Sequence, residues 1–358
     1  MKLHIFNPEH EMALAANLDQ FTSPRAGREM RSQLSFLPAL WAEDGDFVLV
    51  DDVKKAQMSV SRLKCRCAEV QFVCPNEMPI TMIDKVLPWG WNRSIVHQLK
   101  RLHVPTDLLP TEETLDFIRE ISHRRWASQN LLPAFRSLGE DVIGEAYYYS
   151  SFPNYICPVV IKSPWSCSGR GVRYALSEQQ YMSHERWANN VINRQGGIMI
   201  EPYYSRIMDF AMEFESTANE IKYLGLSIFL TNKGGYTGNV LASEEYKLHV
   251  ISQFVPLSIL EEARGIIMRE MEVLVSNKYQ GFFGIDMMIV ENKSKRKDTI
   301  SYQLHPCVEL NLRRTMGHVA LAIKRNDDTP MMMGINYDGS YRFDILPIPQ
   351  DLVDGFMK

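Results

Sequence analysis

The sequence predicts a mixed α/β fold, and three observations support this prediction. Residues 2–6 form a strand-like run that stops at Asn7-Pro8, and residues 47–50 form a second, apolar run between acidic turn residues. A stretch of helical character, residues 28–41, lies between these two runs. From about residue 157 onward, short apolar runs separated by turn residues become frequent. An alternation of strands and helices followed by a strand-rich region is typical of α/β architecture.

Composition excludes several classes of protein. A chain of 358 residues is long enough for two or three structural units with a large core. The 37 aromatic residues (16 Phe, 15 Tyr and 6 Trp) argue against disorder, and the net charge of −4 argues against a general nucleic-acid binder. No apolar run approaches the ~18 residues of a membrane span. Polar residues interrupt residues 1–17, so no signal peptide is expected either.

The six cysteines are scattered, which in a chain this long favours reduced thiols over a disulfide framework. We therefore expect a cytoplasmic protein. Cys65, Cys67 and Cys74 lie close together in sequence, but no fourth ligand follows at a spacing that suits a metal. Ordinary thiols are the favoured interpretation of this group.

Helix and strand signals recur along the rest of the chain. A helix is expected over residues 93–102, and Thr111 is expected to cap the next one. The patterns Ser177-x-x-Gln180 and Ser258-x-x-Glu261 predict two further helix starts with capping boxes. The predicted strands cover residues 159–162, 171–175, 198–201, 210–216 and 220–231.

The first segment with a chemical signature is residues 159–172, VVIKSPWSCSGRGV. A buried strand delivers Lys162, and a loop of small residues, 166–171, follows directly. Small residues let backbone N–H groups approach an anion, and a lysine can contact a phosphate as a point charge. No G-x-x-x-x-G-K-[ST] pattern occurs, so this is not a Walker A loop. A glycine- and serine-rich hairpin with a solvated lysine is the alternative.

The second segment is residues 198–213, IMIEPYYSRIMDFAME. A strand ends at Glu201 and is followed by Tyr203, and Asp209 lies eight residues beyond Glu201. Backbone groups at such a strand end can bind the edge of an adenine, and a nearby carboxylate can hold ribose hydroxyls. An ordinary strand–loop–strand connection is the alternative.

The third segment joins the strand GFFGIDMMIV, which contains Asp286, to LHPCVELNLRR. Because strand side chains alternate, Glu309 and Asn311 project from one face about 7 Å apart, and Asp286 can point to the same face. Two carboxylates and an amide oxygen form a hard oxygen site that suits Mg²⁺. Salt bridges from these acids to Arg313 and Arg314 are the alternative, which leaves the asparagine unexplained.

These three segments, in this order, resemble the ATP-grasp superfamily over roughly residues 115–325. The resemblance implies two lobes that clamp a nucleotide, preceded by an N-terminal α/β domain. The corresponding boundaries are residues 1–110 for the N-terminal domain, on the acceptor-substrate side, 111–200 for a small lobe with the glycine-rich loop, and 201–358 for a large lobe with the metal site.

The resemblance also implies roles for individual residues. The loop 166–171 would fold over the phosphates, the backbone near Tyr203 would join Glu201 in holding adenine, and Asp209 would bind ribose. Arg124 stands in the region where the family has a further phosphate-binding lysine, and either Arg124 or Arg125 could replace it. The implied metal ligands are Asp286, Glu309 and Asn311. Arg313 and Arg314 are the residues implied to stabilise charge on the phosphoryl group. The residues implied to bind the nucleotide are Lys162, Ser166, Ser168, Gly169, Arg170, Gly171, Glu201, Tyr203, Asp209 and Arg124.

The activity implied by the resemblance is phosphoryl transfer from ATP, assisted by Mg²⁺ or Mn²⁺, to a small carboxylate that an amine then attacks. The expected partners are ATP and small-molecule acid and amine substrates, with no nucleic acid and no membrane, and a homodimer is left open. A small-molecule kinase with the same nucleotide site is one alternative. A nucleotide-binding protein without turnover is another, although the retained metal-ligand set argues against it.

Four further features have less specific interpretations. His10 and Glu11 follow the first strand, a position from which they could line an acceptor pocket. His305 could face inward with Glu309, in a supporting or core role rather than as a ligand. Residues 236–239 could form a hairpin turn or a loop over the substrate. The basic run 293–297 favours a solvated hairpin loop over a nucleic-acid patch.

Overall fold

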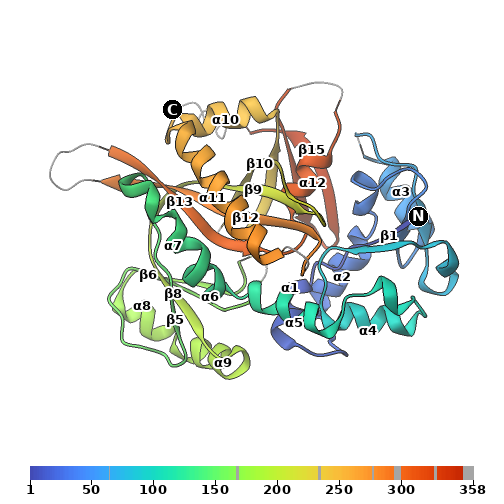
Figure 1. The fold of residues 1–358 in the computed structure, drawn as a ribbon, viewed down its shortest axis with the longest axis horizontal. Helices are drawn as coiled ribbons and strands as arrows, with labels where there is room; N and C mark the ends of the chain where they lie inside the picture. Colours follow the sequence, from blue (N-terminus) through green and yellow to red (C-terminus); the bar gives the residue numbers. More distant parts are fainter. Residues whose placement is uncertain are drawn as a thin grey trace.

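The computed structural model describes residues 1–63, 65–166, 169–232, 235–275, 278–293, 300–325 and 329–349. It has three β-sheets, which confirms the mixed α/β class. In Figure 1 the N-terminal sheet lies on one side of the molecule in blue, and the small sheet lies at the opposite lower corner in green. The largest sheet, yellow to red, lies between them.

The N-terminal sheet is parallel, with the strand order β3-β2-β1-β4. Hydrophobic clusters cover both of its faces, as expected for a parallel sheet. The strands predicted at residues 2–6 and 47–50 are confirmed. The sheet contains β1 (Lys2–Ile5), β2 (Phe47–Leu49), β3 (Gln71–Val73) and β4 (Lys85–Pro88).

Side-chain caps explain where several helices of this region begin. Asp52, Asn92 and Thr111 accept hydrogen bonds from the N–H groups of residues 55, 95 and 114 at 3.0, 3.0 and 3.2 Å. The caps at Asn92 and Thr111 confirm the two helices predicted there. The helices are α1 (His10–Ala16), α2 (Arg25–Leu34), α3 (Val53–Ser61), α4 (Arg93–Arg101) and α5 (Glu112–Ile121).

Two predictions for this region were incomplete. The helix predicted over residues 28–41 runs instead from Arg25 to Leu34, and a separate 3₁₀ turn covers Leu37–Leu40, where Pro38 interrupts the pattern. Helix α1 was not predicted, because Asn7-Pro8 ends a strand and Glu9 provides no side-chain cap for a helix.

Short helical turns connect α5 to the small sheet. They are α6 (Arg124–Trp126), a π-helical turn (Ala127–Leu131), α7 (Leu132–Ala134) and a 3₁₀ segment (Phe135–Asp141). Apolar residues of this connection pack into the core below the large sheet. The connection therefore holds Arg124 at the junction between the small and large sheets.

The small sheet is antiparallel, with the strand order β5-β8-β6-β7. Ser177 caps α8 by accepting from the N–H of Gln180, while the Gln180 amide oxygen accepts from the N–H of Leu176 rather than from Ser177. The predicted cap at Ser177 is confirmed, but the reciprocal hydrogen bond of a capping box is made to the residue before it. This unit contains β5 (Tyr147–Tyr149), β6 (Val159–Lys162), β7 (Val172–Ala175), α8 (Glu178–Ser183), α9 (Glu185–Gln195) and β8 (Ile198–Pro202).

The large sheet is antiparallel, with the order β13-β12-β9-β10-β11-β14-β15, and helices α10 and α11 pack on one face. Strands β12 and β13 pair with each other, and the loop predicted at residues 293–297 lies, from residue 294 onward, outside the described residues. Its elements are β9 (Ser205–Ser216), β10 (Ile221–Asn232), β11 (Gly235–Leu241), α10 (Glu244–Ser252), α11 (Leu257–Val275), β12 (Gly281–Lys293), β13 (Ile300–Asn311), α12 (Met316–Ala322), β14 (Met331–Tyr337) and β15 (Tyr341–Pro347).

Two sequence-based interpretations of this region change. The capping box at Ser258 is wrong, because α11 begins one residue earlier, at Leu257, directly after Pro256. Residues 236–239 are neither a turn nor a loop but part of strand β11. Among the described residues, no helix is both long and apolar enough to cross a membrane.

Side-chain alternation divides the large sheet into an apolar face and a polar face. On β9, Phe210, Met212 and Phe214 point into the main core, so the intervening Asp209 and Glu213 point to the other face. The second apolar face of the N-terminal sheet packs against β11, β14, β15 and α12. The loops after β1 are thereby held next to the polar face of the large sheet.

His305, on β13, is buried without a hydrogen-bond partner for either ring nitrogen. Residues 306–308 break the register between His305 and Glu309, and the His305 ring packs against Gly144 and Tyr204. His305 therefore occupies a core position, and the expectation that it faces inward beside Glu309 is not met. Burial lowers the pKa of His305 to about 3.

This burial predicts a pH-dependent effect of the substitution His305→Leu, which roughly conserves volume. In the unfolded chain a histidine binds a proton below about pH 6.5, whereas folded His305 does so only near pH 3. The free energy of unfolding of the wild type therefore decreases as pH falls below 6.5. The variant has no histidine at this position, so this contribution to the decrease is absent. Relative to wild type, we expect the variant to gain about 2 kcal/mol more at pH 5 than at pH 8 in urea unfolding. Equal effects at both pH values would contradict the prediction.

Candidate functional site

A cavity of about 1050 Å³ opens where the three sheets meet. Its walls come from the loops and helices after β1, from the small sheet and its glycine-rich loop, and from the polar face of the large sheet. Pockets that hold one drug-sized ligand span about 300–1,000 Å³, so this cavity has room for more than one small ligand.

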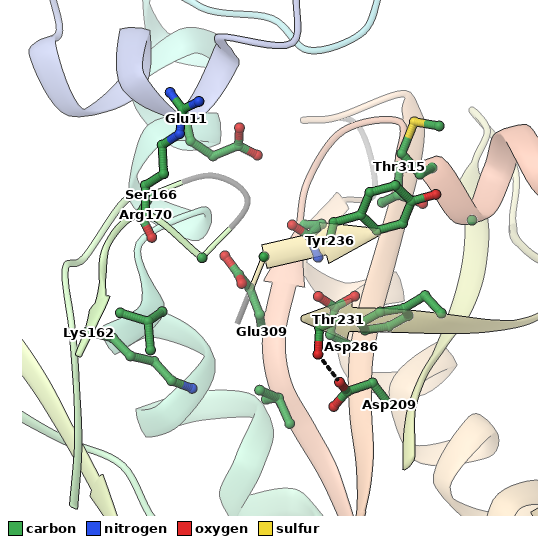
Figure 2. Close-up of a pocket in the computed structure, with 18 of the residues that line it drawn as sticks. Glu11, Lys162, Ser166, Arg170, Asp209, Thr231, Tyr236, Asp286, Glu309 and Thr315 are labelled. Carbon is green, nitrogen blue, oxygen red and sulfur yellow. Dashed lines mark hydrogen bonds between the residues drawn. The ribbon is translucent and has the colours of Figure 1, made fainter. Parts of the chain in front are cut away.

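Cationic and acidic side chains face each other across the cavity. In Figure 2, Lys162 and Arg170 lie on the side of the small sheet, and Asp286 and Asp209 lie on the side of the large sheet. Glu309 lies between the two groups, and Glu11 reaches in from the N-terminal region. Such an arrangement can hold a polyanion together with a cation.

Lys162 is the last residue of β6 and forms an ion pair with Glu201 of the neighbouring strand β8. The Nζ–Oε2 distance is 2.5 Å, and both side chains are about nine-tenths buried. The pair brings together two of the predicted site residues. A buried charge without a partner would be costly, and the pair avoids this cost for both side chains.

The loop after β6 lines the cavity with Ser166, Gly169 and Arg170. Gly171 does not line it. A Cβ atom at Gly171 would overlap the side chains of Ser163 and Ser166, so a glycine is required where the loop folds back on the strand. Ser168, also predicted to bind phosphate, lies outside the described residues.

The strand end after Glu201 differs in part from the prediction. The backbone N–H of Tyr203 donates to the carbonyl oxygen of Pro158 at 3.1 Å, which continues the pairing of the small sheet. This N–H is thus engaged within the protein, while the Tyr203 side chain lines the cavity.

Asp209 lies on β9 opposite this strand end. Its Oδ2 accepts from Arg206 at 2.6 Å and from the Thr231 hydroxyl at 3.0 Å, the bond drawn in Figure 2. Burial raises the pKa of Asp209, and the nearby Arg206 opposes the rise. Its placement on the cavity wall agrees with the prediction, whereas its partner Arg206 was not predicted.

Arg124, rather than Arg125, lines the cavity. Its guanidinium donates to the Ser163 carbonyl at 2.5 Å, to the Ser166 hydroxyl at 2.9 Å and to Glu309 at 2.7 Å. Burial disfavours the charged form, but the attraction of Glu309 outweighs it, so the pKa of Arg124 is raised. Arg125 lies over the ring of Tyr148 instead.

The three predicted metal ligands lie in two adjacent rows of the polar face. Ala211, Asp286 and Glu309 are paired across β9, β12 and β13, and Glu213, Gly284 and Asn311 form the next row. Burial raises the pKa of Asp286 well above its usual value, and the neighbouring Glu309 and Glu213 raise it further. Three carboxyl groups are therefore close enough here to disfavour the charged form of Asp286.

The close approach of these carboxyl groups is the observation that makes the three predicted ligands suitable for Mg²⁺. Asp286, Glu309 and Asn311 offer two carboxylates and one amide oxygen, which are the hard ligands that Mg²⁺ prefers. Among the described residues, no group of three or more His, Cys, Asp or Glu is placed to hold a metal. The protein would therefore supply part of the ligand set, and phosphate and water oxygens the remainder.

The two predicted arginines separate at the end of β13. Arg313 lines the cavity, donates to the Asn311 amide oxygen at 2.9 Å and forms an ion pair with Glu11. Arg314 does not line the cavity, because its guanidinium is stacked between the rings of Trp41 and Phe282. The placement of Arg314 thus gives it no contact with a ligand in this cavity.

Glu213 is a cavity residue that was not singled out from the sequence. It is 1% exposed, it lies four residues after Asp209 on the same face of β9, and its Oε1 accepts from Thr315 at 2.9 Å. The available signal was the i, i+4 spacing of two acids in a strand. The sequence alone does not show which strand lies beside them.

Two other candidates lie outside the main cavity. His10 is fully buried, accepts through Nδ1 from the Asn92 amide nitrogen at 3.1 Å, and does not line the cavity, unlike Glu11. Burial lowers the pKa of His10 to about 3. Cys65, Cys67 and Cys74 are free thiols away from the cavity, as their favoured interpretation predicted.

No protein-family model and no curated protein matches the chain. Among solved structures, the chain is similar to an ATP-grasp superfamily protein from Archaeoglobus fulgidus, at 13% identity and a TM-score of 0.50, with 98% of this chain and 100% of that chain covered. It is also similar to N5-carboxyaminoimidazole synthetase from Staphylococcus aureus (10% identity, TM-score 0.49, 100% and 97% covered). A third similarity is to biotin carboxylase from Campylobacter jejuni, at 12% identity and a TM-score of 0.47, with 93% of this chain and 75% of that chain covered. The first similarity confirms the fold that the three motifs predict.

Proposed function

The chain has the ATP-grasp fold, and we propose that it is an ATP- and Mg²⁺-dependent ligase that joins a small carboxylate to an amine. The observation that supports this most directly is the geometry of the cavity. Lys162, Arg124 and Arg313 lie on the same cavity as Asp286 and Glu309, in a space large enough for a nucleotide and a second molecule.

In this proposal the adenosine part of ATP lies near Glu201, Tyr203 and Asp209. Lys162 and Arg124 bind the phosphates, and the loop that carries Ser166 and Arg170 covers them. Residues 1–110 form the acceptor-substrate side, residues 111–200 the small lobe and residues 201–358 the large lobe. A cytoplasmic location and a homodimer stay predictions.

The reaction needs no covalent nucleophile from the protein. A carboxylate oxygen of the acid attacks the γ-phosphorus and ADP leaves, and the nitrogen of the amine then attacks the acyl carbon. Inorganic phosphate leaves, and the nitrogen loses a proton to give the amide. Bound Mg²⁺, held by Asp286, Glu309 and Asn311, would neutralise phosphate charge. Arg313 orients the acid and offsets charge on the transferring group.

The test is the identity of the products. Full-length protein is incubated with ATP, Mg²⁺ and a panel of small carboxylic acids and amines, and ADP and inorganic phosphate are measured. We expect both products in equal amounts when an acid and an amine are present together. ADP with a stable phosphorylated product would instead identify a kinase. Failure to bind ATP with Mg²⁺ would exclude both activities.

A further inference from the structure

Part of the cavity lies beyond the predicted nucleotide contacts, between the N-terminal region and the large sheet; we call it the acceptor half. Its wall is mainly apolar. It is lined by Phe6, Met30, Trp89, Met316 and Ile335. Because exposed apolar surface is costly to hydrate, this wall favours a ligand with an apolar body.

Acidic groups outnumber cationic ones in the acceptor half. Among its described lining residues, four are acidic, and the arginine is Arg313. Arg313 is already engaged by Glu11 and by the Asn311 amide oxygen. The acids are Glu9, Glu11, Glu29 and Glu213. Three of these acids already have arginine partners, because Glu9 pairs with Arg31, Glu11 with Arg313 and Glu29 with Arg25. Among the described residues Glu213 has no arginine or lysine partner, and its negative charge favours a positively charged ligand over a second anion.

Glu213 supplies a specific point of attachment. Its side chain is 1% exposed and its Oε1 accepts from Thr315, while its Oε2 has no hydrogen-bond donor among the residues that the structure describes. A buried carboxylate oxygen without a donor is unfavourable, and a ligand N–H group would remove this cost.

The histidine next to Glu213 does not act as that donor. His318 Nδ1 lies 3.0 Å from Oε2, but the backbone N–H of Thr315 donates to this same Nδ1 at 3.1 Å. His318 Nε2 lies 3.1 Å from the carbonyl oxygen of Phe214 and therefore carries the proton. In the neutral imidazole with its proton on Nε2, two acceptor atoms face each other, and among the described residues Oε2 has no proton donor.

Two glycines make room for this carboxylate. A Cβ atom at Gly317 would overlap Oε1, and one at Gly284 would overlap Oε2. The Glu213 carboxylate thus fills the place of a side chain at Gly284, in the row that Glu213 and Asn311 share. Glu213 is close enough to Asp286 to raise its pKa. A group bound at Glu213 would therefore lie next to the acids that face the phosphates.

We propose that Glu213 binds the positively charged nitrogen of an amine substrate whose apolar or aromatic body packs against Phe6, Met30, Trp89, Met316 and Ile335. The assignment rests on the proposed function in that this amine would be the acceptor of the acyl group. Its ammonium group first gives one proton to the Glu213 carboxylate, and the neutral nitrogen then attacks the acyl carbon. The assignment goes further by naming the anchoring residue and by restricting the acceptor to amines with an apolar body.

The binding test needs no ATP and no turnover. Isothermal titration of the full-length protein at pH 7 compares 2-phenylethylamine, which is positively charged, with neutral 2-phenylethanol and anionic 3-phenylpropionate. We expect the amine to bind roughly 10- to 100-fold more tightly than either, the range of one charge-assisted hydrogen bond. Glu213→Gln should remove this preference. The control Glu215→Gln, two residues along the strand and outside the cavity, should keep it.

Thermal unfolding separates recognition from folding. In Glu213→Gln the new amide oxygen can accept from Thr315, and the negative charge that faces His318 Nδ1 is removed, so we expect no loss of thermal stability. Equal binding of amine and alcohol, no binding of the amine, or an unchanged preference in a folded Glu213→Gln variant would overturn the proposal. Amine binding without ATP turnover would instead uphold it and contradict the ligase function.

Discussion

Replacing Glu309 with glutamine is expected to lower ATP turnover by at least about 100- to 1,000-fold, the cost typical of losing one charge-stabilising group in an active site. Glu309 is a predicted metal ligand and also the partner of Arg124, at 2.7 Å. The neutral amide keeps a hydrogen-bond acceptor for Arg124 but removes the negative charge. We therefore expect weaker use of Mg²⁺ and a poorly placed phosphate-binding arginine.

The measurement is ADP release as a function of Mg²⁺ concentration. Half-saturation should move to higher Mg²⁺ in Glu309→Gln, which a purely structural role of Glu309 would not produce. Glu220→Gln is the matched control, because Glu220 is exposed at the turn between β9 and β10 and pairs with Lys222. Full turnover in a folded Glu309→Gln variant would exclude Glu309 as a metal ligand.

The features of the site that could be predicted are those that depend on local geometry. Alternation along a strand places Glu309 and Asn311 on one face, and a hairpin connection places Asp286 beside them. The same reasoning was less accurate for His305, because a register break at residues 306–308 separates it from Glu309. A bulge of this kind depends on packing and has no sequence signature here.

Contacts between distant parts of the chain could not be predicted. Arg313 pairs with Glu11, 302 positions away, and Arg314 stacks on Trp41. Two adjacent arginines at a strand end look alike in the sequence, and their separation depends on the fold beyond the strand. Glu213 was missed for the same reason, since its placement depends on Thr315 and on the close approach of its carboxylate to Gly284.

The ion pair between Lys162 and Glu201 predicts a second large effect. In Lys162→Met the Glu201 carboxylate stays about nine-tenths buried and loses its cation. Breaking one side of a buried pair typically costs about 3–5 kcal/mol, so the free energy of unfolding should fall by roughly this amount. ADP affinity should fall as well, because Lys162 is a proposed phosphate contact. Lys222→Met, on the exposed Lys222 of β10, is the matched control.

The double variant Lys162→Met/Glu201→Gln separates the two consequences. It removes both charges, so we expect most of the lost stability to return, while ADP affinity stays low because the phosphate contact is still missing. Urea unfolding and ADP titration of wild type, both single variants and the double variant complete the cycle. If the double variant binds ADP like wild type, Lys162 does not contact phosphate. If Lys162→Met is as stable as wild type, the ion pair with Lys162 does not offset the free-energy cost of burying the Glu201 carboxylate. Stability and nucleotide binding can thus be assigned separately to the same lysine.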